Sequence, residues 1–360
     1  MKLIEKIKEK DGARQINICG IKVLRYNKYD NLLLNTFSIR THHDWTCSYK
    51  YMTILGFKFI IWPRYMMIYA KRFKKELSLK DKKYILEYQF KRRMGYKPNI
   101  DNPTTFNEKL QWLKLYYHNP VMTTCADKYS VKSYVSEKVG TEHVVPLLGV
   151  WDKPEDIEFD KLPNQFVLKT TWGCGNNLIV KDKSKLNIEE TRTIFKKWLN
   201  IKKNHYYLSF EWGYKNIVPR IIAEEYVGEL GDNLTCYKIF NFNSKPYLIQ
   251  AVFDDKTSYE TINYYDLNWN KLDLRQNFPN NENEMPKPKN LDKMLKLSEK
   301  LAQEFPYFVR VDFYEFGNKV LFSEFTFYSD NGMAKFQPEE WDKKLGKLIH
   351  LPTDNKSKVG

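Results

Sequence analysis

The sequence predicts an α+β fold, which follows from its length and from the order of its segments. The chain has 360 residues, enough for about two or three domains with a sizeable buried core. Strand-like segments come in runs of two between helical segments, whereas an α/β fold alternates strand and helix strictly. The predicted strands are 165–170, 177–180, 220–227, 235–241, 247–252, 308–316 and 320–327, and the predicted helices between them are 188–199 and 291–304.

Cysteine usage and the apolar segments indicate where the protein resides. The five cysteines form no CxxC pair, so neither a disulfide framework nor a zinc site is expected, and a reducing compartment fits. The first ten residues are charged and lack the apolar core of a secretory signal. The most apolar stretch, 52–70, is interrupted by Lys58, Pro63 and Arg64, so no transmembrane helix is expected. We therefore expect a cytoplasmic protein.

The formal net charge of +15 has two interpretations. It is consistent with an anionic partner, such as a membrane surface, a nucleic acid or a nucleotide-linked substrate. Lysine, asparagine, isoleucine and tyrosine are all abundant, however, and a compositional bias of the coding sequence would give the same charge with no functional meaning. No RNP-like, zinc-finger or helix-turn-helix signature supports nucleic-acid binding, so no nucleic-acid partner is expected.

The N-terminal part contains two short β segments and a basic helix. Segments 16–24 and 52–60 each carry a glycine between alternating apolar and lysine positions, which predicts strands that turn at the glycine. Segment 71–93 has ten Lys or Arg against three acids, with apolar residues at near-helical spacing. This basic amphipathic helix would either lie on anionic lipid or pack its apolar stripe on the core.

Two further helices are predicted before the main run of strands. Helix 104–117 has Thr105 as a candidate N-cap and Glu108 three residues later, which together form a capping box. A second helix would open at Asp127, whose side chain can cap its free N–H groups, and would end at residue 139. This arrangement places Lys128 in the first turn of the second helix.

Segment 309–327 is predicted to be a β-hairpin, and its register decides its meaning. A two-residue turn would pair Asp312 with Ser323 and bury one acid on the apolar face, which is costly. A three-residue loop at 317–319 instead pairs Asp312 with Glu324 and keeps both acids on one face. We favour the second register.

In that register Asp312 lies opposite Glu324, and Arg310 lies opposite Thr326. Two facing carboxylates about 5 Å apart repel each other unless a cation lies between them. Magnesium is the natural candidate, because it binds carboxylate and phosphate oxygens together. The alternative is that Arg310 neutralises the pair on a solvated face.

Segment 165–177 is a strand carrying Lys169 that leads into a loop with Gly173 and Gly175. Backbone N–H groups of such a loop can cradle phosphate while the lysine supplies a positive charge. The segment matches neither the P-loop nor the GxGxxG pattern, and an ordinary turn after a strand has the same composition.

Segment 220–227 is a strand that ends in Glu224, Glu225, Tyr226 and Val227. The backbone at this edge could hydrogen-bond an adenine while one acid binds a ribose hydroxyl. The alternative is a pair of exposed acids at the end of an edge strand.

Taken in order, these segments resemble the ATP-grasp superfamily, and more closely its TupA-like branch, which is associated with bacterial cell-surface polysaccharide and teichuronopeptide biosynthesis. The resemblance covers about residues 107–346 and rests on NEKLQWLKLYYHNP, ADKYSVKSYV, VPLLGVWD, LPNQFVLKTTWGCGN, PRIIAEEYV, YKIFNFNSKP, VRVDFYEFGNKVLFSEFTF and WDKKLG. It implies two α+β lobes that clasp ATP. The implied parts are an N-terminal extension (1–105), a small lobe with its preceding helices (106–225), a large lobe with the metal-site hairpin (226–350) and a tail (351–360).

The resemblance also implies roles for individual residues. Arg310 and Lys169 would act in catalysis, Arg310 by stabilising the charge that develops during phosphoryl transfer. Magnesium would be held by Asp312 and Glu324, with Thr326 completing the site. Relatives usually carry a His and more glycines where Trp172, Cys174 and Asn176 stand here. Nucleotide binding is assigned to Lys128, Lys169, Gly173, Gly175, Glu224, Glu225, Tyr226, Val227 and Lys238.

The implied reaction is ATP-dependent ligation of a carboxylate to an amine through an acyl phosphate, with ADP and phosphate released. By analogy the carboxylate belongs to a uronic acid of a surface polysaccharide, in its free, nucleotide-linked or polymeric form. The implied cofactors are ATP and Mg²⁺, and the location is cytoplasmic or peripheral at the inner face of the membrane. The alternative function is a non-catalytic nucleotide- or polysaccharide-binding protein at the membrane surface.

Overall fold

The computed structural model describes residues 75–227, 235–253, 260–283 and 285–352, together with residues 68–69 and 71–73 and six strands within the first 61 residues. The chain divides into two compact units, residues 1–77 and 78–360. Among the described residues, no helix combines the length and apolar character needed to cross a bilayer.

The N-terminal unit contains two antiparallel sheets of three strands each among its described residues. Each of the two glycine-containing segments lies in a pair of neighbouring strands, the first in β2 and β3 and the second in β5 and β6. The strands are β1 (Ile4–Lys8), β2 (Arg14–Ile18), β3 (Ile21–Tyr26), β4 (Phe37–His43), β5 (Ser48–Ile54) and β6 (Phe57–Ile61).

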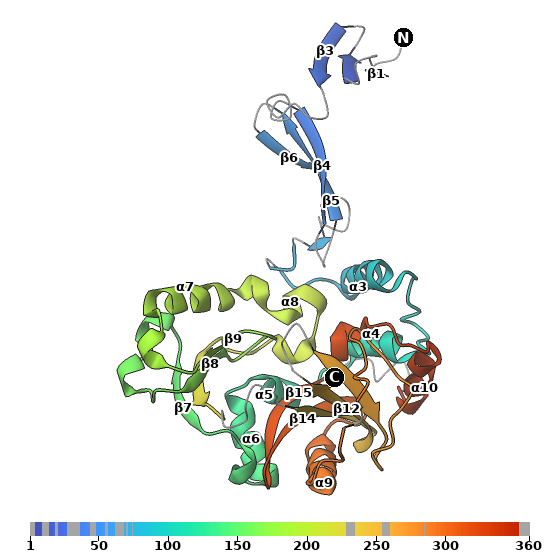
Figure 1. Ribbon diagram of the computed structural model, residues 1–360. Helices are drawn as coiled ribbons and strands as arrows, with labels where there is room; N and C mark the ends of the chain where they lie inside the picture. Colours follow the sequence, from blue (N-terminus) through green and yellow to red (C-terminus); the bar gives the residue numbers. More distant parts are fainter. Residues whose placement is uncertain are drawn as a thin grey trace. The chain divides into compact units, whose positions relative to one another are not determined.

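The second unit is built on two antiparallel sheets with helices packed against them, which confirms the predicted α+β class (Figure 1). The smaller sheet has the strand order β7-β10-β8-β9, from β7 (Leu147–Trp151), β8 (Phe166–Thr170), β9 (Asn177–Val180) and β10 (Ile221–Glu225). The larger sheet has the order β13-β12-β11-β14-β15, from β11 (Cys236–Phe242), β12 (Lys245–Phe253), β13 (Thr261–Tyr265), β14 (Phe308–Phe316) and β15 (Lys319–Thr326). Strands β7 and β13 were not predicted from the sequence; β7 is only partly buried and shows no clear alternation of buried and exposed residues.

The smaller sheet buries one face against α7 (Ile188–Trp198), which lies along β8 and β9 in Figure 1. Phe195 of α7 packs with Phe166 and Leu168 of β8 and with Ile221 of β10, and all four side chains are fully buried. Each contributes roughly 1.5–3 kcal/mol by leaving water. The other face of β8 and β10, which carries Lys169, is therefore left for polar chemistry.

The larger sheet is organised in the same way. Helix α9 (Leu291–Ala302) packs against β11, β12 and β14. Asn241 of β11 donates a hydrogen bond to Ser298 of α9 at 2.9 Å, which ties the helix to the sheet. Because side chains alternate along a strand, Val309 and Val311 belong to one face of β14, and Arg310 and Asp312 belong to the opposite face.

Two helices at the start of this unit correspond to predicted ones. Helix α4 (Phe106–Tyr116) begins at Thr105, and the predicted capping box with Glu108 is present. The basic helix is α3 (Leu79–Met94); it starts later than predicted, because Ser78 caps it by accepting a hydrogen bond from the backbone of Asp81.

The apolar stripe of α3 packs on the protein core. Ile85, Leu86 and Phe90 are all fully buried, and Phe90 packs with Met94 and Met333. This arrangement corresponds to the structural alternative for the helix, although Leu79 at its start is exposed.

The segment around Asp127 differs from its prediction. A short helix, α5 (Val121–Ala126), ends at Asp127, and the following helix α6 spans Ser130–Val139. Asp127 still accepts hydrogen bonds from the backbone of Tyr129 at 2.8 Å and Ser130 at 3.4 Å. Lys128 therefore lies just before the helix, in the link between α5 and α6, where its backbone N–H bonds the carbonyl of Thr171.

The remaining helices connect these elements. Helices α8 (His205–Ser209) and α10 (Glu340–Leu348) were not predicted. The described 3-10 turns are η1 (Thr141–His143), η2 (Pro154–Asp156), η3 (Phe159–Lys161), η4 (Lys183–Lys185), η5 (Ile201–Lys203), η6 (Trp212–Tyr214) and η8 (Ser329–Gly332).

Candidate active site

The hairpin β14–β15 places the predicted metal residues opposite one another. Asp312 pairs with Glu324, and Arg310 pairs with Thr326. The predicted loop 317–319 is wrong, because Phe316 pairs with Lys319 and leaves a two-residue turn with Gly317 at φ +55°. The register shifts after Asp312, where Ser323 is left over as a β-bulge. The bulge supplies the extra residue that the sequence analysis had placed in the loop.

Arg310 lies between the two carboxylates. Its Nε and one terminal nitrogen each donate to an Asp312 carboxylate oxygen at 2.8 Å, and that terminal nitrogen lies 3.5 Å from Glu324. Burial raises the pKa of Asp312, and the guanidinium of Arg310, which stays charged, opposes that shift. The structure agrees with one part of the alternative, because Arg310 pairs with both acids; the Asp312 side chain is only 1% exposed, so the face is not solvated at that residue.

The same residues fit a magnesium ion that is bound together with phosphate. Among the residues that the structure describes, no group of three or more metal-binding side chains exists. Mg²⁺ commonly takes only one or two protein carboxylates and fills its other positions with phosphate oxygens and water. Glu324, with a side chain 40% exposed, is the more accessible of the two acids. Thr326 borders the site opposite Arg310.

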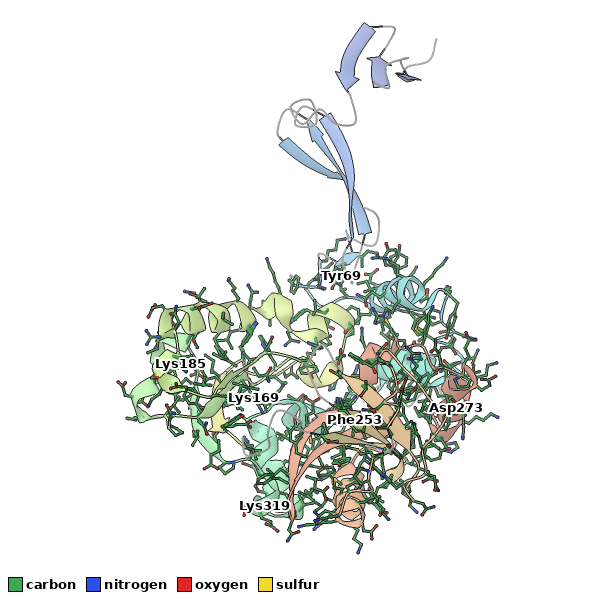
Figure 2. The ribbon with its side chains drawn as sticks, in the orientation of Figure 1. Tyr69, Lys169, Lys185, Phe253, Asp273 and Lys319 are labelled. Carbon is green, nitrogen blue, oxygen red and sulfur yellow. The ribbon has the colours of Figure 1, made fainter. Side chains whose placement is uncertain are left out.

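Three lysines gather around Glu224 and the glycine loop. Glu224 forms an ion pair with Lys132 at 2.6 Å and another with Lys169 at 2.5 Å. Burial by itself would raise the pKa of Glu224, but these two ammonium groups lower it below its ordinary value. The Nζ of Lys128 donates to the backbone carbonyl of Gly173 at 2.7 Å. Figure 2 labels Lys169 on the smaller sheet.

Lys128 connects the two groups of residues. Burial lowers the pKa of Lys128, while the nearby carboxylates of Glu324 and Glu224 act in the opposite direction. Lys128 lies two residues after α5, which packs against β15 of the larger sheet, and its own hydrogen bonds are to Thr171 and Gly173, which follow β8 of the smaller sheet. The structure thus brings together a cluster of lysines that suits phosphate groups and a pair of carboxylates that suits a metal ion.

The predicted nucleotide-binding residues occupy two places. Lys238 of β11 pairs with Asp312 across the larger sheet, and its charge opposes the rise that burial causes in the pKa of that acid. Glu225 and Tyr226 line a separate pocket of about 690 Å³, together with Leu148 and residues 161–165.

The remaining nucleotide-binding predictions concern Val227, which follows β10, and the glycine loop. Val227 directly follows the residues that line this pocket. In the loop, Gly173 and Gly175 have φ of +81° and +73°, a conformation that favours glycine. The adenine and phosphate roles of all these residues stay predictions.

Sequence reasoning missed several residues that build the site. Lys132 lies four residues after Lys128, and that spacing, read as one turn of the predicted helix, was the signal available for it. Ser329 accepts a hydrogen bond from Arg310 at 3.2 Å, from a turn that follows β15. Lys114 of α4 is fully buried; its Nζ donates to the backbone carbonyl of Asn331 at 2.8 Å and to the side chain of the same residue. No local pattern marks a lysine inside an apolar helix as buried.

We expect Glu224→Gln to lower the free energy of unfolding and to remove the ion pair that holds the side chain of Lys169. The substitution removes the carboxylate charge that holds two partly buried ammonium groups, at a cost of about 1–3 kcal/mol. Urea denaturation measures the loss. Glu225→Gln makes the same chemical change at an exposed neighbour and should cost no more than about 0.5 kcal/mol. Equal losses in the two variants would show that the ion pairs are unimportant.

We expect stability to rise with pH through the deprotonation of Lys114. Burial lowers the pKa of Lys114 to about 7, from its ordinary value of 10.5. Between these values the unfolded chain binds the extra proton, so the free energy of unfolding should rise by up to about 1.4 kcal/mol per pH unit. Below about pH 7 both states are protonated and this dependence disappears. Urea titrations from pH 6 to 10 measure it, and Lys114→Met should lack this part of the slope.

The chain resembles one protein family and several solved structures. A family model described as TupA-like ATP-grasp matches residues 108–350, whereas no curated protein gives a significant match. Among solved structures, D-alanine–D-alanine ligase from Bacillus anthracis is 19% identical with a TM-score of 0.37, over 61% of this chain and 63% of that one. L-amino acid ligase from Bacillus licheniformis is 12% identical with a TM-score of 0.34, over 57% and 41%.

A third structure, N5-carboxyaminoimidazole ribonucleotide synthetase from Thermus thermophilus, is 15% identical with a TM-score of 0.33, over 61% of this chain and 51% of that one. This chain therefore spans less than two thirds of the length of these proteins. The family model covers most of the unit that contains both sheets and the hairpin. The chain belongs to the TupA-like ATP-grasp family.

Proposed function

We propose that the chain is an ATP-dependent ligase that joins a carboxylate to an amine. The observation that carries the proposal is the pairing of Asp312 with Glu324, with Arg310 between them and with Lys128 following α5, which packs against β15. Carboxylates for a metal ion and lysines for phosphate, placed together, are what phosphoryl transfer from ATP requires. The family membership supports the same chemistry.

Each residue has a distinct role in the proposed reaction. Lys128 and Lys169 bind phosphate oxygens, and Asp312 and Glu324 hold Mg²⁺, which neutralises phosphate charge when it is bound. The substrate carboxylate attacks the γ-phosphorus, the bond to the β-phosphate oxygen breaks, and ADP leaves. Arg310 stabilises the negative charge that is distributed over the transferring group. The amine then attacks the acyl carbon, loses a proton, and displaces phosphate.

A hydroxylamine trap tests this proposal without knowledge of the natural amine. Purified protein, Mg²⁺, ATP and pooled carboxylic acids, including sugar acids, are incubated with hydroxylamine, which converts an acyl phosphate to a hydroxamate. We expect ADP and hydroxamate in equal amounts. AMP with pyrophosphate would indicate adenylation instead, and Mg²⁺-dependent ATP binding with no ADP from any acid would favour a non-catalytic binding protein.

The natural acid is the finer part of the proposal. We propose a sugar carboxylate of a surface polysaccharide, in line with the processes with which the resembled branch is associated. Deconvolution of the acid pool tests this choice, because a uronic acid should give the fastest ADP release. Faster release with amino acids than with any sugar acid would contradict it and leave the ligase reaction standing.

A further inference from the structure

A second pocket lies outside the residues assigned to ATP and magnesium. Its volume is about 360 Å³. It is formed where the end of α3 meets two segments of irregular chain, one before residue 280 and one after η8. Asp273, labelled in Figure 2, marks the first of these segments. The lining residues are Arg93, Arg275, Gln276, Asn277, Met333, Lys335 and Gln337.

The pocket is lined by three cations and no acid. Arg93, Arg275 and Lys335 are all exposed, and within the described part of the chain none of them takes part in an ion pair. Arg93 stands in the last turn of α3, where a cation also complements the helix dipole. That explanation does not apply to Arg275 and Lys335, which belong to no helix.

The backbone holds the two segments in fixed positions. Arg275 and Gln337 exchange two backbone hydrogen bonds, at 2.8 and 2.9 Å, so the two segments are paired across the pocket. Met333 packs with Phe90 and Met94 of α3, which fixes the helix end that carries Arg93. The cations therefore project from an ordered frame with contributions from three parts of the chain.

Gln276 supplies a buried polar group that faces the pocket. The residue is 5% exposed, and its side-chain oxygen accepts a hydrogen bond from the hydroxyl of Tyr264 at 3.0 Å. The residue lines the pocket. The amide nitrogen of a glutamine in a pocket wall is a donor that can bind an acceptor atom of a ligand.

The pocket adjoins the candidate active site through two hydrogen bonds. Asn277, in the pocket wall, donates to the carboxylate of Asp330 at 2.8 Å. The preceding residue, Ser329, accepts from Arg310 at 3.2 Å. A ligand in this pocket would thus lie next to the turn that supports Arg310.

We propose that this pocket binds an anionic group of the substrate, a phosphate or a carboxylate, at a distance from the reacting carboxylate. The proposal rests on the proposed ligase function. A single exposed ion pair contributes little to binding, so three exposed cations favour a group or a cluster of groups with two or more negative charges. The substrate class is therefore a polyanion, and the pocket recognises the part of it that does not react.

The test uses two probes, fructose 1,6-bisphosphate for phosphate and tricarballylate for carboxylate. Binding is measured by calorimetry at constant ionic strength, with Mg²⁺ in excess and the nucleotide site filled by a non-hydrolysable ATP analogue. We expect at least one probe to bind to the wild-type protein. The double variant Arg275→Gln, Lys335→Gln should bind the same probe at least tenfold more weakly. The probe that binds identifies the chemical group.

The matched control is the double variant Arg92→Gln, Lys343→Gln, which removes the same charge from exposed residues outside the pocket. It should bind the probe like the wild-type protein, and affinity for the ATP analogue should be unchanged in both variants. Absence of binding by either probe, or equal loss in both variants, would overturn the proposal. Neither result would affect formation of the hydroxamate, so failure of the pocket and failure of the ligase reaction are distinguishable.

Discussion

Glu324→Gln should reduce Mg²⁺-dependent ADP release by about 10²–10³-fold, the range seen when one group that stabilises transition-state charge is removed. The amide keeps the size of the side chain and loses the charge that a metal ion needs. Because the Glu324 side chain is 40% exposed and its contact to Arg310 is 3.5 Å long, folding should be almost unaffected. The assay couples ADP release to hydroxamate formation, with a thermal melt for each protein.

Glu299→Gln is the control for this prediction, because it makes the same chemical change on the exposed side of α9. Its activity and melting temperature should equal those of the wild-type protein. Activity of Glu324→Gln within threefold of wild type, with an unchanged dependence on Mg²⁺, would mean that Glu324 does not bind the metal.

Asp312→Asn should lower the free energy of unfolding by about 3–5 kcal/mol, in addition to abolishing activity. Asp312 carries the charge that offsets the buried guanidinium of Arg310 through two hydrogen bonds of 2.8 Å. A guanidinium is not deprotonated in proteins, so Arg310 stays charged when this carboxylate is removed. The neutral amide therefore leaves the buried guanidinium with only its longer ion pair with Glu324, at 3.5 Å. Urea denaturation of both proteins measures the difference.

A double variant separates the loss of charge balance from the loss of packing. Arg310→Met with Asp312→Leu removes both charges and keeps apolar volume, which is often neutral or stabilising for a buried pair. It should recover most of the stability lost in Asp312→Asn while remaining inactive. A double variant as unstable as Asp312→Asn would show that the pair matters through its shape and not through its charge.

The hairpin illustrates what the sequence could and could not predict. The pairing of Asp312 with Glu324 followed from the cost of burying an acid, and the structure confirms it. The loop was predicted wrongly because a three-residue loop and a bulge at Ser323 each remove one residue from β15, and both give the same pairing at the acids. The two arrangements differ only in where the extra residue lies, and the pattern of apolar residues does not reveal that position.

The lysine cluster shows a different limit. Lys169 and Glu224 were each singled out by local patterns, but their ion pair depends on how β8 lies beside β10 in the folded sheet. Lys132 joins them from α6, across a long separation in sequence. Lys114 lies in a helix where almost every residue is buried. Its hydrogen-bond partner Asn331 is far along the chain, so the neighbouring sequence does not reveal the environment of this lysine. Local sequence patterns identify candidate residues, and tertiary contacts determine which of them interact.

The central claim is that Asp312 and Glu324 hold magnesium for ATP bound by Lys128 and Lys169. Calorimetric titration of a non-hydrolysable ATP analogue, with and without Mg²⁺, into the wild-type protein and Glu324→Gln tests it most directly. We expect Mg²⁺ to strengthen binding to the wild-type protein at least tenfold and to have almost no effect on the variant. An equal strengthening by Mg²⁺ in both proteins would contradict the claim.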